Sequence, residues 1–315
     1  MTSDGRDEPS ESSRRVHPFE TRDAAWRMER RTFLRLGLGF TASVVGVVGY
    51  TFWIEPHWLE IVERELPIAG LPRELAGKRL VHLSDIHVGP RVDDEYVASS
   101  FRRARSLNPD IVAITGDLIS YEGPQQFTQL RAALRELPHG RLATVAILGN
   151  HDYGFGWRMP EVAVAVEREL RDAGVTVLRN SAMDVQGLAI VGLGDLWANQ
   201  FAPEAALAPY QRGPALVLSH NPDTLDRQGW GEYRGWVLAG HTHGGQCKPP
   251  FLRPPLLPVQ NKRYTSGAIP LEDGRAVYIS RGVGHLIPVR FNVRPEITAF
   301  TLVEAGAGAR ASDSV

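Results

Sequence analysis

The stretch KRLVHLSDIH at residues 78–87 decides the fold, because it joins a buried strand to a pair of potential metal ligands. Its apolar residues form a short run that is typical of a strand covered on both faces. Asp85 and His87 follow this run directly, and alternate residues of an extended chain point to the same side. We therefore expect a strand whose carboxyl end carries an Asp-x-His pair.

Similar polar groups follow four further apolar runs. They are Gly116-Asp117, Gly149-Asn150-His151-Asp152, Ser219-His220 and Gly240-His241-Thr242-His243. In open α/β sheets, binding sites collect at the carboxyl ends of the strands. Glycine permits the tight turns that bring such side chains together. A single group of this kind is more often a turn than a ligand, but five in succession predict one shared site.

Helix and strand patterns alternate along the first half of the chain, and strands dominate the second half. This order predicts an α/β domain, a two-sheet α-β-β-α sandwich with helices outside and the site at the strand ends. We expect three helices. The first is capped by Asp93 or Asp94 and is ended by Pro109, the second covers 127–137, and the third covers 161–173. Expected strands cover 79–84, 111–115, 143–148, 189–193, 215–218, 236–238, 276–279 and 297–302.

Taken together, these motifs resemble the calcineurin-like metallophosphoesterases, over roughly Leu80 to Leu302. The resemblance implies a dinuclear centre in which a water or hydroxide between two ions attacks phosphorus. It also implies that His151 acts on the leaving-group oxygen and that Asp152 orients His151. The implied ligands are Asp85, His87 and His243 for one ion, Asn150, His220 and His241 for the other, and Asp117 between both.

The charges and donor types agree with that assignment. Two divalent ions bring four positive charges, whereas Asp85, Asp117 and a hydroxide bring three negative ones, so the centre attracts phosphate. Oxygen and imidazole donors without a thiolate favour Mn, Fe or Zn. We therefore expect two divalent ions and a hydrolase that cleaves phosphate esters, foremost diesters, in small-molecule or lipid-linked substrates.

Motifs in the last third of the chain narrow the resemblance to a bacterial membrane-associated subgroup. Some of its members are described as phosphodiesterases, and others hydrolyse UDP-2,3-diacylglucosamine in lipid A synthesis. That pyrophosphate hydrolysis is the alternative activity here. A non-catalytic metal-binding domain is an alternative of another class, which His151 and the full ligand set oppose. The motifs are Gly240–Gln246, Ser280–Gly284, Pro288–Phe291 and Pro295-Glu296.

The N-terminal region has the features of a membrane anchor. Residues 36–54 carry no charge and are long enough to cross a bilayer as a helix. Arg30-Arg31-Thr32-Phe33-Leu34-Arg35 before them resembles a twin-arginine export signal, although Glu29 departs from its pattern. Because no small-x-small cleavage site follows, we expect an uncleaved anchor and engagement of the twin-arginine export machinery. The flanking arginines predict a catalytic domain on the extracytoplasmic side of the cell membrane.

These features divide the chain into five expected parts. They are a disordered tail (1–25), a signal or anchor (26–54), a linker and lead-in (55–77), the catalytic domain (78–304) and a second disordered tail (305–315). The 35 basic and 36 acidic residues create no basic field, so a nucleic acid substrate is not expected. The single cysteine, Cys247, excludes an intramolecular disulfide.

Several other residues are considered individually. Arg281 is a candidate ligand for a substrate phosphate, whereas Arg290 is expected mainly in a surface ion pair. His82 is expected as a core histidine and Cys247 as a buried apolar residue. The loop 249–258 holds five prolines and several large apolar residues. It either packs on the second sheet or, by hypothesis, contacts a bilayer and admits an amphiphilic substrate.

Overall fold

The computed structural model describes residues 30–306. The expected tail at 1–25, residues 26–29 of the expected anchor and the tail beyond residue 306 lie outside the described residues. Two compact units, 1–47 and 48–315, divide the chain.

Helix α1 (Arg30–Gly49) supplies the described residues of the first unit and ends just beyond its boundary. It begins a continuous helical stretch, Arg31–His57, in which residues 36–54 carry no charge. This stretch is long and apolar enough to cross a membrane, a property that signal sequences share. The N-terminal apolar segment therefore indicates membrane association.

The second unit begins with two short helical turns and contains a first sheet of six strands. The turns are η1 (Tyr50–Ile54) and η2 (Glu55–His57). Strands β2 to β5 run parallel, whereas β12 pairs antiparallel with β2 and parallel with β1. In spatial order the strands are β1 (Glu60–Ala69), β12 (Glu296–Ala305), β2 (Arg79–Leu83), β3 (Ile111–Ile114), β4 (Ala143–Ala146) and β5 (Thr176–Val177).

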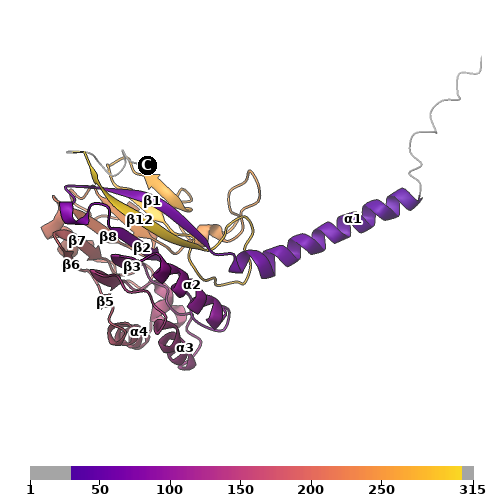
Figure 1. Ribbon diagram of the computed structural model, residues 1–315, viewed down its shortest axis with the longest axis horizontal. Coiled ribbons are helices and arrows are strands. Elements are labelled where there is room, and N and C mark those ends of the chain that lie inside the picture. The colour runs from indigo at the N-terminus through magenta and orange to yellow at the C-terminus, as the bar shows by residue number, and fades with distance from the viewer. Residues whose placement is uncertain (1–29, 307–315) are drawn as a thin grey trace, which may run out of the picture. The chain divides into compact units, whose positions relative to one another are not determined.

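The second sheet also has six strands and packs on the first (Figure 1). Its four central strands are parallel and almost wholly buried, as continuous apolar runs require. In spatial order the strands are β10 (Gly267–Pro270), β11 (Ala276–Ile279), β9 (Trp236–Ala239), β8 (Ala215–Leu218), β7 (Leu188–Gly192) and β6 (Ser181–Val185).

Helices cover the outer faces of this sandwich. Helices α2 (Asp94–Ser106), α3 (Gln125–Leu134) and α4 (Pro160–Asp172) pack on the first sheet through one hydrophobic cluster. A second cluster fills the space between the sheets, and a third lies under α5 (Pro203–Leu207) on the second sheet. Short helical turns lie at η3 (Arg73–Leu75), η4 (Asn150–Tyr153), η5 (Phe155–Trp157), η6 (Ala208–Tyr210), η7 (Pro222–Asp226) and η8 (His243–Gly245).

The α-β-β-α sandwich confirms the expected fold class, and most elements lie within a few residues of their expected positions. The Asp93 side chain caps α2 by accepting a hydrogen bond from the backbone N–H of Tyr96. One correction concerns the expected linker at 55–77, which contains β1, paired along its length with β12. Strands β5, β6 and β10 were not expected from the sequence.

Candidate metal centre

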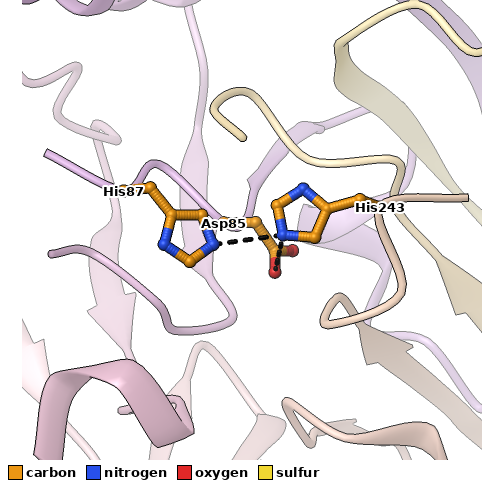
Figure 2. A group of neighbouring side chains, drawn as sticks. All are labelled: Asp85, His87 and His243. Atoms are coloured by element: carbon orange, nitrogen blue, oxygen red, sulfur yellow. Dashed lines mark hydrogen bonds and ion pairs between the residues drawn. The ribbon is translucent and has the colours of Figure 1, made fainter. Parts of the chain in front are cut away.

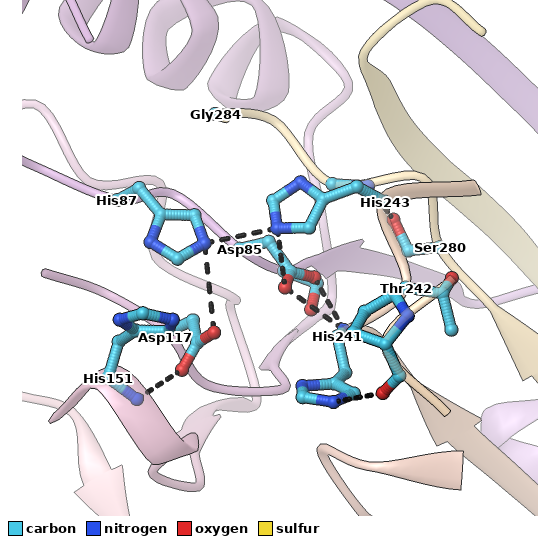
Figure 3. A network of polar contacts seen from close by, with 12 residues as sticks. Asp85, His87, Asp117, His151, His241, Thr242, His243, Ser280 and Gly284 are labelled. Atoms are coloured by element: carbon cyan, nitrogen blue, oxygen red, sulfur yellow. Dashed lines mark hydrogen bonds and ion pairs between the residues drawn. The ribbon is translucent and has the colours of Figure 1, made fainter. Parts of the chain in front are cut away.

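The carboxyl ends of β2, β3 and β4 lie side by side in register, and those of β8 and β9 do the same in the second sheet. The loops that follow these strands bring together six of the seven metal ligands expected from the sequence, namely Asp85, His87, Asp117, His220, His241 and His243. Figure 3 shows members of this group pointing toward one another from separate loops. The site therefore exists only when the two sheets have packed.

The first group of ligands combines Asp85 and His87 after β2 with His243 after β9 (Figure 2). His87 Nε2 lies 3.1 Å from His243 Nε2, which lies 3.3 Å from Asp85 Oδ1. All three side chains are buried. Two imidazole nitrogens and a carboxylate oxygen thus converge on a point where a cation fits.

The second group combines Asp117 after β3 with His220 and His241 from the second sheet. His220 Nε2 lies 3.1 Å from Asp117 Oδ2 and 3.2 Å from His241 Nδ1. Asp117 Oδ2 is also only 3.6 Å from His87 Nε2 of the first group. This carboxylate therefore lies between the two groups, as a bridging ligand would.

Three of the histidines are fixed by partners behind the site. His220 Nδ1 donates to the Thr115 carbonyl at 2.7 Å, and His241 Nε2 donates to the Pro258 carbonyl at 2.9 Å. His87 Nδ1 lies 3.0 Å from Ser120 Oγ. A proton held on the outer nitrogen leaves the lone pair of the inner one free, which is the state that binds a metal ion.

The side-chain amide of Asn150 also fits a metal site. Its side chain is fully buried, and within residues 30–306 neither its oxygen nor its nitrogen has a hydrogen-bond partner. A buried amide without partners costs free energy, so native proteins retain one only where something else binds it. The donor set is therefore well suited to cations with oxygen and nitrogen ligands.

Burial sets the protonation of most of the imidazoles. It lowers the pKa of His87 and His243 well below the usual range and that of His241 to about 3. These rings are neutral at physiological pH, as ligands must be. For His220, burial acts to lower the pKa, but the charges of Asp117 and neighbouring carboxylates raise it to about 10. A cation bound here would displace that proton.

The backbone of the site is strained at the ligands themselves. Asp85, His87, Asp117, His241 and His243 all have positive φ, between 48° and 70°. Each such residue costs about 1–3 kcal/mol, and such strain concentrates at functional sites. The loops therefore hold these side chains in directions that relaxed strand ends would not give.

Two glycines have no room for a side chain. A Cβ on Gly240 would lie 1.9 Å from Ser84 Oγ, and one on Gly149 would lie 2.3 Å from Asp117 Oδ1. Both glycines precede ligands in the chain, so the close approach of backbone to ligand explains the Gly-His and Gly-Asn patterns.

The residue expected to orient His151 has a different role. Asp152 accepts backbone hydrogen bonds from Leu118 at 2.8 Å, Ile119 at 3.2 Å and Gly149 at 2.9 Å. Its carboxyl group thus ties the loop after β3 to the loop after β4, and no hydrogen bond joins it to the His151 ring. His151 is partly exposed, and its ring centroid lies 5.1 Å from that of His87.

The two arginines have different surroundings, and only Arg290 departs from its expected position. Arg281 pairs with Glu296 and Glu60, so its guanidinium is committed to two carboxylates. Arg290 is not in a surface ion pair but fully buried, and donates to the carbonyls of Arg281, Gly282, Gly284 and Val293. Gly284 in turn donates to the Asp85 carbonyl at 2.7 Å. Arg290 therefore supports the loop that backs the site.

Two of the remaining expectations have clear outcomes. His82 is a buried core histidine, as expected, 2.8 Å from Thr115 Oγ1. Cys247 is half-buried rather than fully buried.

Sequence analysis missed an aspartate and two tryptophans. Asp195, buried after β7, accepts a hydrogen bond from Ala198 and so shapes the loop that carries Trp197. The Trp197 ring stands edge-on to His241, with 4.3 Å between centroids, and packs against Trp157. Gly194-Asp195 after a strand repeats the Gly116-Asp117 pattern, which could have revealed it.

Several known proteins have similar sequences. Phosphodiesterase YaeI of Escherichia coli is 32% identical over 282 residues, covering 88% of this chain and 100% of its own. UDP-2,3-diacylglucosamine pyrophosphatase LpxG of Chlamydia trachomatis is 27% identical, covering 83% and 97%. A Danio rerio protein named transmembrane protein with metallophosphoesterase domain is 30% identical, covering 88% and 63%.

A family model described as calcineurin-like phosphoesterase matches residues 78–245, which span all seven expected metal ligands. Two groups of ligands for divalent ions, the two-sheet fold and these relatives agree on one class, the hydrolases that act on phosphate esters. The chain belongs to the calcineurin-like phosphoesterase family.

Proposed function

We propose that this chain hydrolyses phosphodiesters at a site for two divalent ions, which Asp117 would help to hold together with the ligands of both groups. The observation that carries the proposal is the position of Asp117 Oδ2, 3.1 Å from His220 Nε2 and 3.6 Å from His87 Nε2. The remaining ligands divide between the ions. Asp85, His87 and His243 would hold one, and Asn150, His220 and His241 the other.

Divalent ions in this site, of which Mn, Fe and Zn suit the donors, supply a Lewis acid that activates water and offsets phosphate charge. The protein contributes the positions of the donors and a dry, strained frame around them. Asp117 Oδ1 accepts a hydrogen bond from the His151 backbone at 2.9 Å, which fixes the loop carrying that residue. We assign to the His151 ring the protonation of the leaving oxygen.

A second candidate activity is hydrolysis of a UDP-2,3-diacylglucosamine-type pyrophosphate. The activity for which the Chlamydia relative is named favours it, as does an apolar pocket beside the site. Product analysis on that nucleotide lipid separates the two, because a pyrophosphate hydrolase releases UMP and a lipid phosphate. The non-catalytic alternative is disfavoured by the family and by the complete set of donors.

We further propose that α1 anchors the chain in the cell membrane with 78–304 as an extracytoplasmic catalytic domain, exported through the twin-arginine pathway. The apolar helix and its flanking arginines support this. Labelling of a cysteine introduced at exposed Val164 by a membrane-impermeant reagent in intact cells tests the topology. Labelling only after lysis would place the domain in the cytoplasm.

The catalytic proposal is tested with bis(p-nitrophenyl) phosphate and each candidate metal. His241→Ala and Asp117→Asn should each reduce kcat/KM by about 1000-fold or more, because the first removes a ligand of one ion and the second removes the carboxylate shared by both. Val164→Ser, an exposed change on α4, is the matched control and should keep full activity. Substantial turnover by folded Asp117→Asn in metal-replete buffer would contradict the assignment.

A further inference from the structure

A cavity of about 370 Å³ opens directly beside the proposed metal centre. One side of it is polar and is formed by Asp117, His151, His241 and His243. We call the seven proposed metal ligands the ligand floor. The volume lies within the range of cavities that bind small ligands, so a substrate bound at the floor extends into this space.

Two loops, 255–258 and 286–289, also line the cavity, and we call them the apolar wall. Every lining residue that these two loops supply is apolar. Leu256 and Ile287 are 75% and 55% exposed, although each is a large aliphatic side chain. An exposed apolar surface beside a polar site is typical of a region that binds an apolar part of a ligand.

The wall is attached to the floor by specific hydrogen bonds. The Gln246 side chain donates to the carbonyls of Ile287 at 2.8 Å and Val289 at 2.7 Å. The Pro258 carbonyl accepts from His241 Nε2, a nitrogen of a proposed metal ligand. Lys262 Nζ donates to the Leu257 carbonyl at 2.7 Å and is thereby engaged by the backbone. These hydrogen bonds therefore hold the wall in a fixed position next to the ligand floor.

We propose that the apolar wall binds a long hydrocarbon chain of an amphiphilic phosphoester whose phosphate lies on the ligand floor. This inference rests on the proposed function and names the class of its substrate. The floor with its ions attracts the anionic phosphate, and the chain occupies the wall. A polar or charged group placed against the wall would lose its bound water without gaining a hydrogen bond. A hydrocarbon chain would instead be stabilised there, because its apolar surface is removed from water.

The test uses p-nitrophenyl alkyl phosphodiesters in which the alkyl group grows from methyl to dodecyl. The leaving group and the reacting bond stay the same, so chain length alone varies. The full chain is held in lipid nanodiscs, and all variants are compared in the same preparation so that partitioning into lipid cancels. With kcat/KM referred to the concentration of ester free in the aqueous phase, the wild type should gain roughly fourfold for each methylene that enters the pocket, until the pocket is filled.

Two wall variants test where the chain binds. Leu256→Asp, at an exposed position, and Leu257→Ser should each reduce the ratio of kcat/KM for the dodecyl and methyl esters by about tenfold or more. Val164→Ser is the matched control and should leave the ratio unchanged. A similar reduction in both wall variants supports the proposal.

Two results would overturn the inference while leaving the proposed function intact. One is a wild-type kcat/KM that does not depend on chain length, and the other is an unchanged ratio in both wall variants. A wild type that hydrolyses none of the esters with any metal would instead overturn the proposed function itself. The methyl ester thus separates failure of the chemistry from failure of the chain-binding pocket.

Discussion

The ligand floor is built from residues that follow directly on buried strands, whereas the apolar wall is built from two irregular loops. The floor's ligands are buried and joined by contacts with specific partners. The wall is largely exposed, and the side chains that it contributes to the lining of the pocket are apolar. The difference shows that metal ligands must be held in position to within a fraction of an ångström. Apolar contacts are non-directional, so the loops that make them can be less rigidly fixed.

Removal of metal tests the floor alone and should have the largest effect. A chelator should abolish turnover and lower the Tm, because the folded floor binds the ions and the unfolded chain does not. Adding back Mn, Fe or Zn one at a time, followed by assay and calorimetry, identifies the ion that restores both. Full activity after exhaustive chelation would show that the floor does not need ions.

Arg290 supports both regions, because it backs the floor through Gly282 and Gly284 and lies next to Val289 of the wall. Arg290→Met should lower the free energy of unfolding by about 3–5 kcal/mol, since buried carbonyls lose their only charged donor. Arg212→Met is the matched control, because that side chain is 87% exposed. Urea denaturation measures both, and equal losses would remove the supporting role.

His82 lies in the strand that leads to the floor, and burial lowers its pKa from 6.5 to about 3. Between those values only the unfolded chain binds the proton, so the contribution of His82 to stability falls as pH falls below about 6.5. His82→Gln removes this titration. The stability of the wild type relative to this variant should therefore drop by roughly 3 kcal/mol between about pH 7 and pH 4.

The same urea series at both pH values provides the measurement for His82. Other groups titrate in both proteins, so their effects cancel in the difference. A difference that stays constant with pH would mean that His82 is not held neutral by burial.

Phe251, at the tip of the loop that leads into the wall, should have the smallest effect on stability. The side chain is fully exposed, so Phe251→Ser should change the free energy of unfolding by no more than about 0.5 kcal/mol. By the hypothesis that loop 249–258 contacts a bilayer, it should weaken co-sedimentation with vesicles of the compact unit from Val48 onward. Val164→Ser is the control, and unchanged binding would dismiss the bilayer contact.

Much of the floor could be predicted because its signals are local. Asp85 and Asp117 each follow an apolar run, and parallel strands end at the same edge, so the ligands could be assigned without coordinates. The role of Asp152 could not be predicted, because its partners lie in a different loop. Strand β1 was missed because an edge strand with charged, exposed residues lacks the continuous apolar run of its neighbours.

The sequence by itself determined which residues can bind metal, which strands carry them and which fold class results, because these follow from apolar periodicity and short motifs. Only the tertiary structure decided that His87 meets His243 across 156 positions of sequence, and that Arg290 is buried. It also decided that a proline-rich loop forms an apolar wall beside the ligands. Such contacts depend on how two sheets pack, and sheet packing depends on many side chains at once.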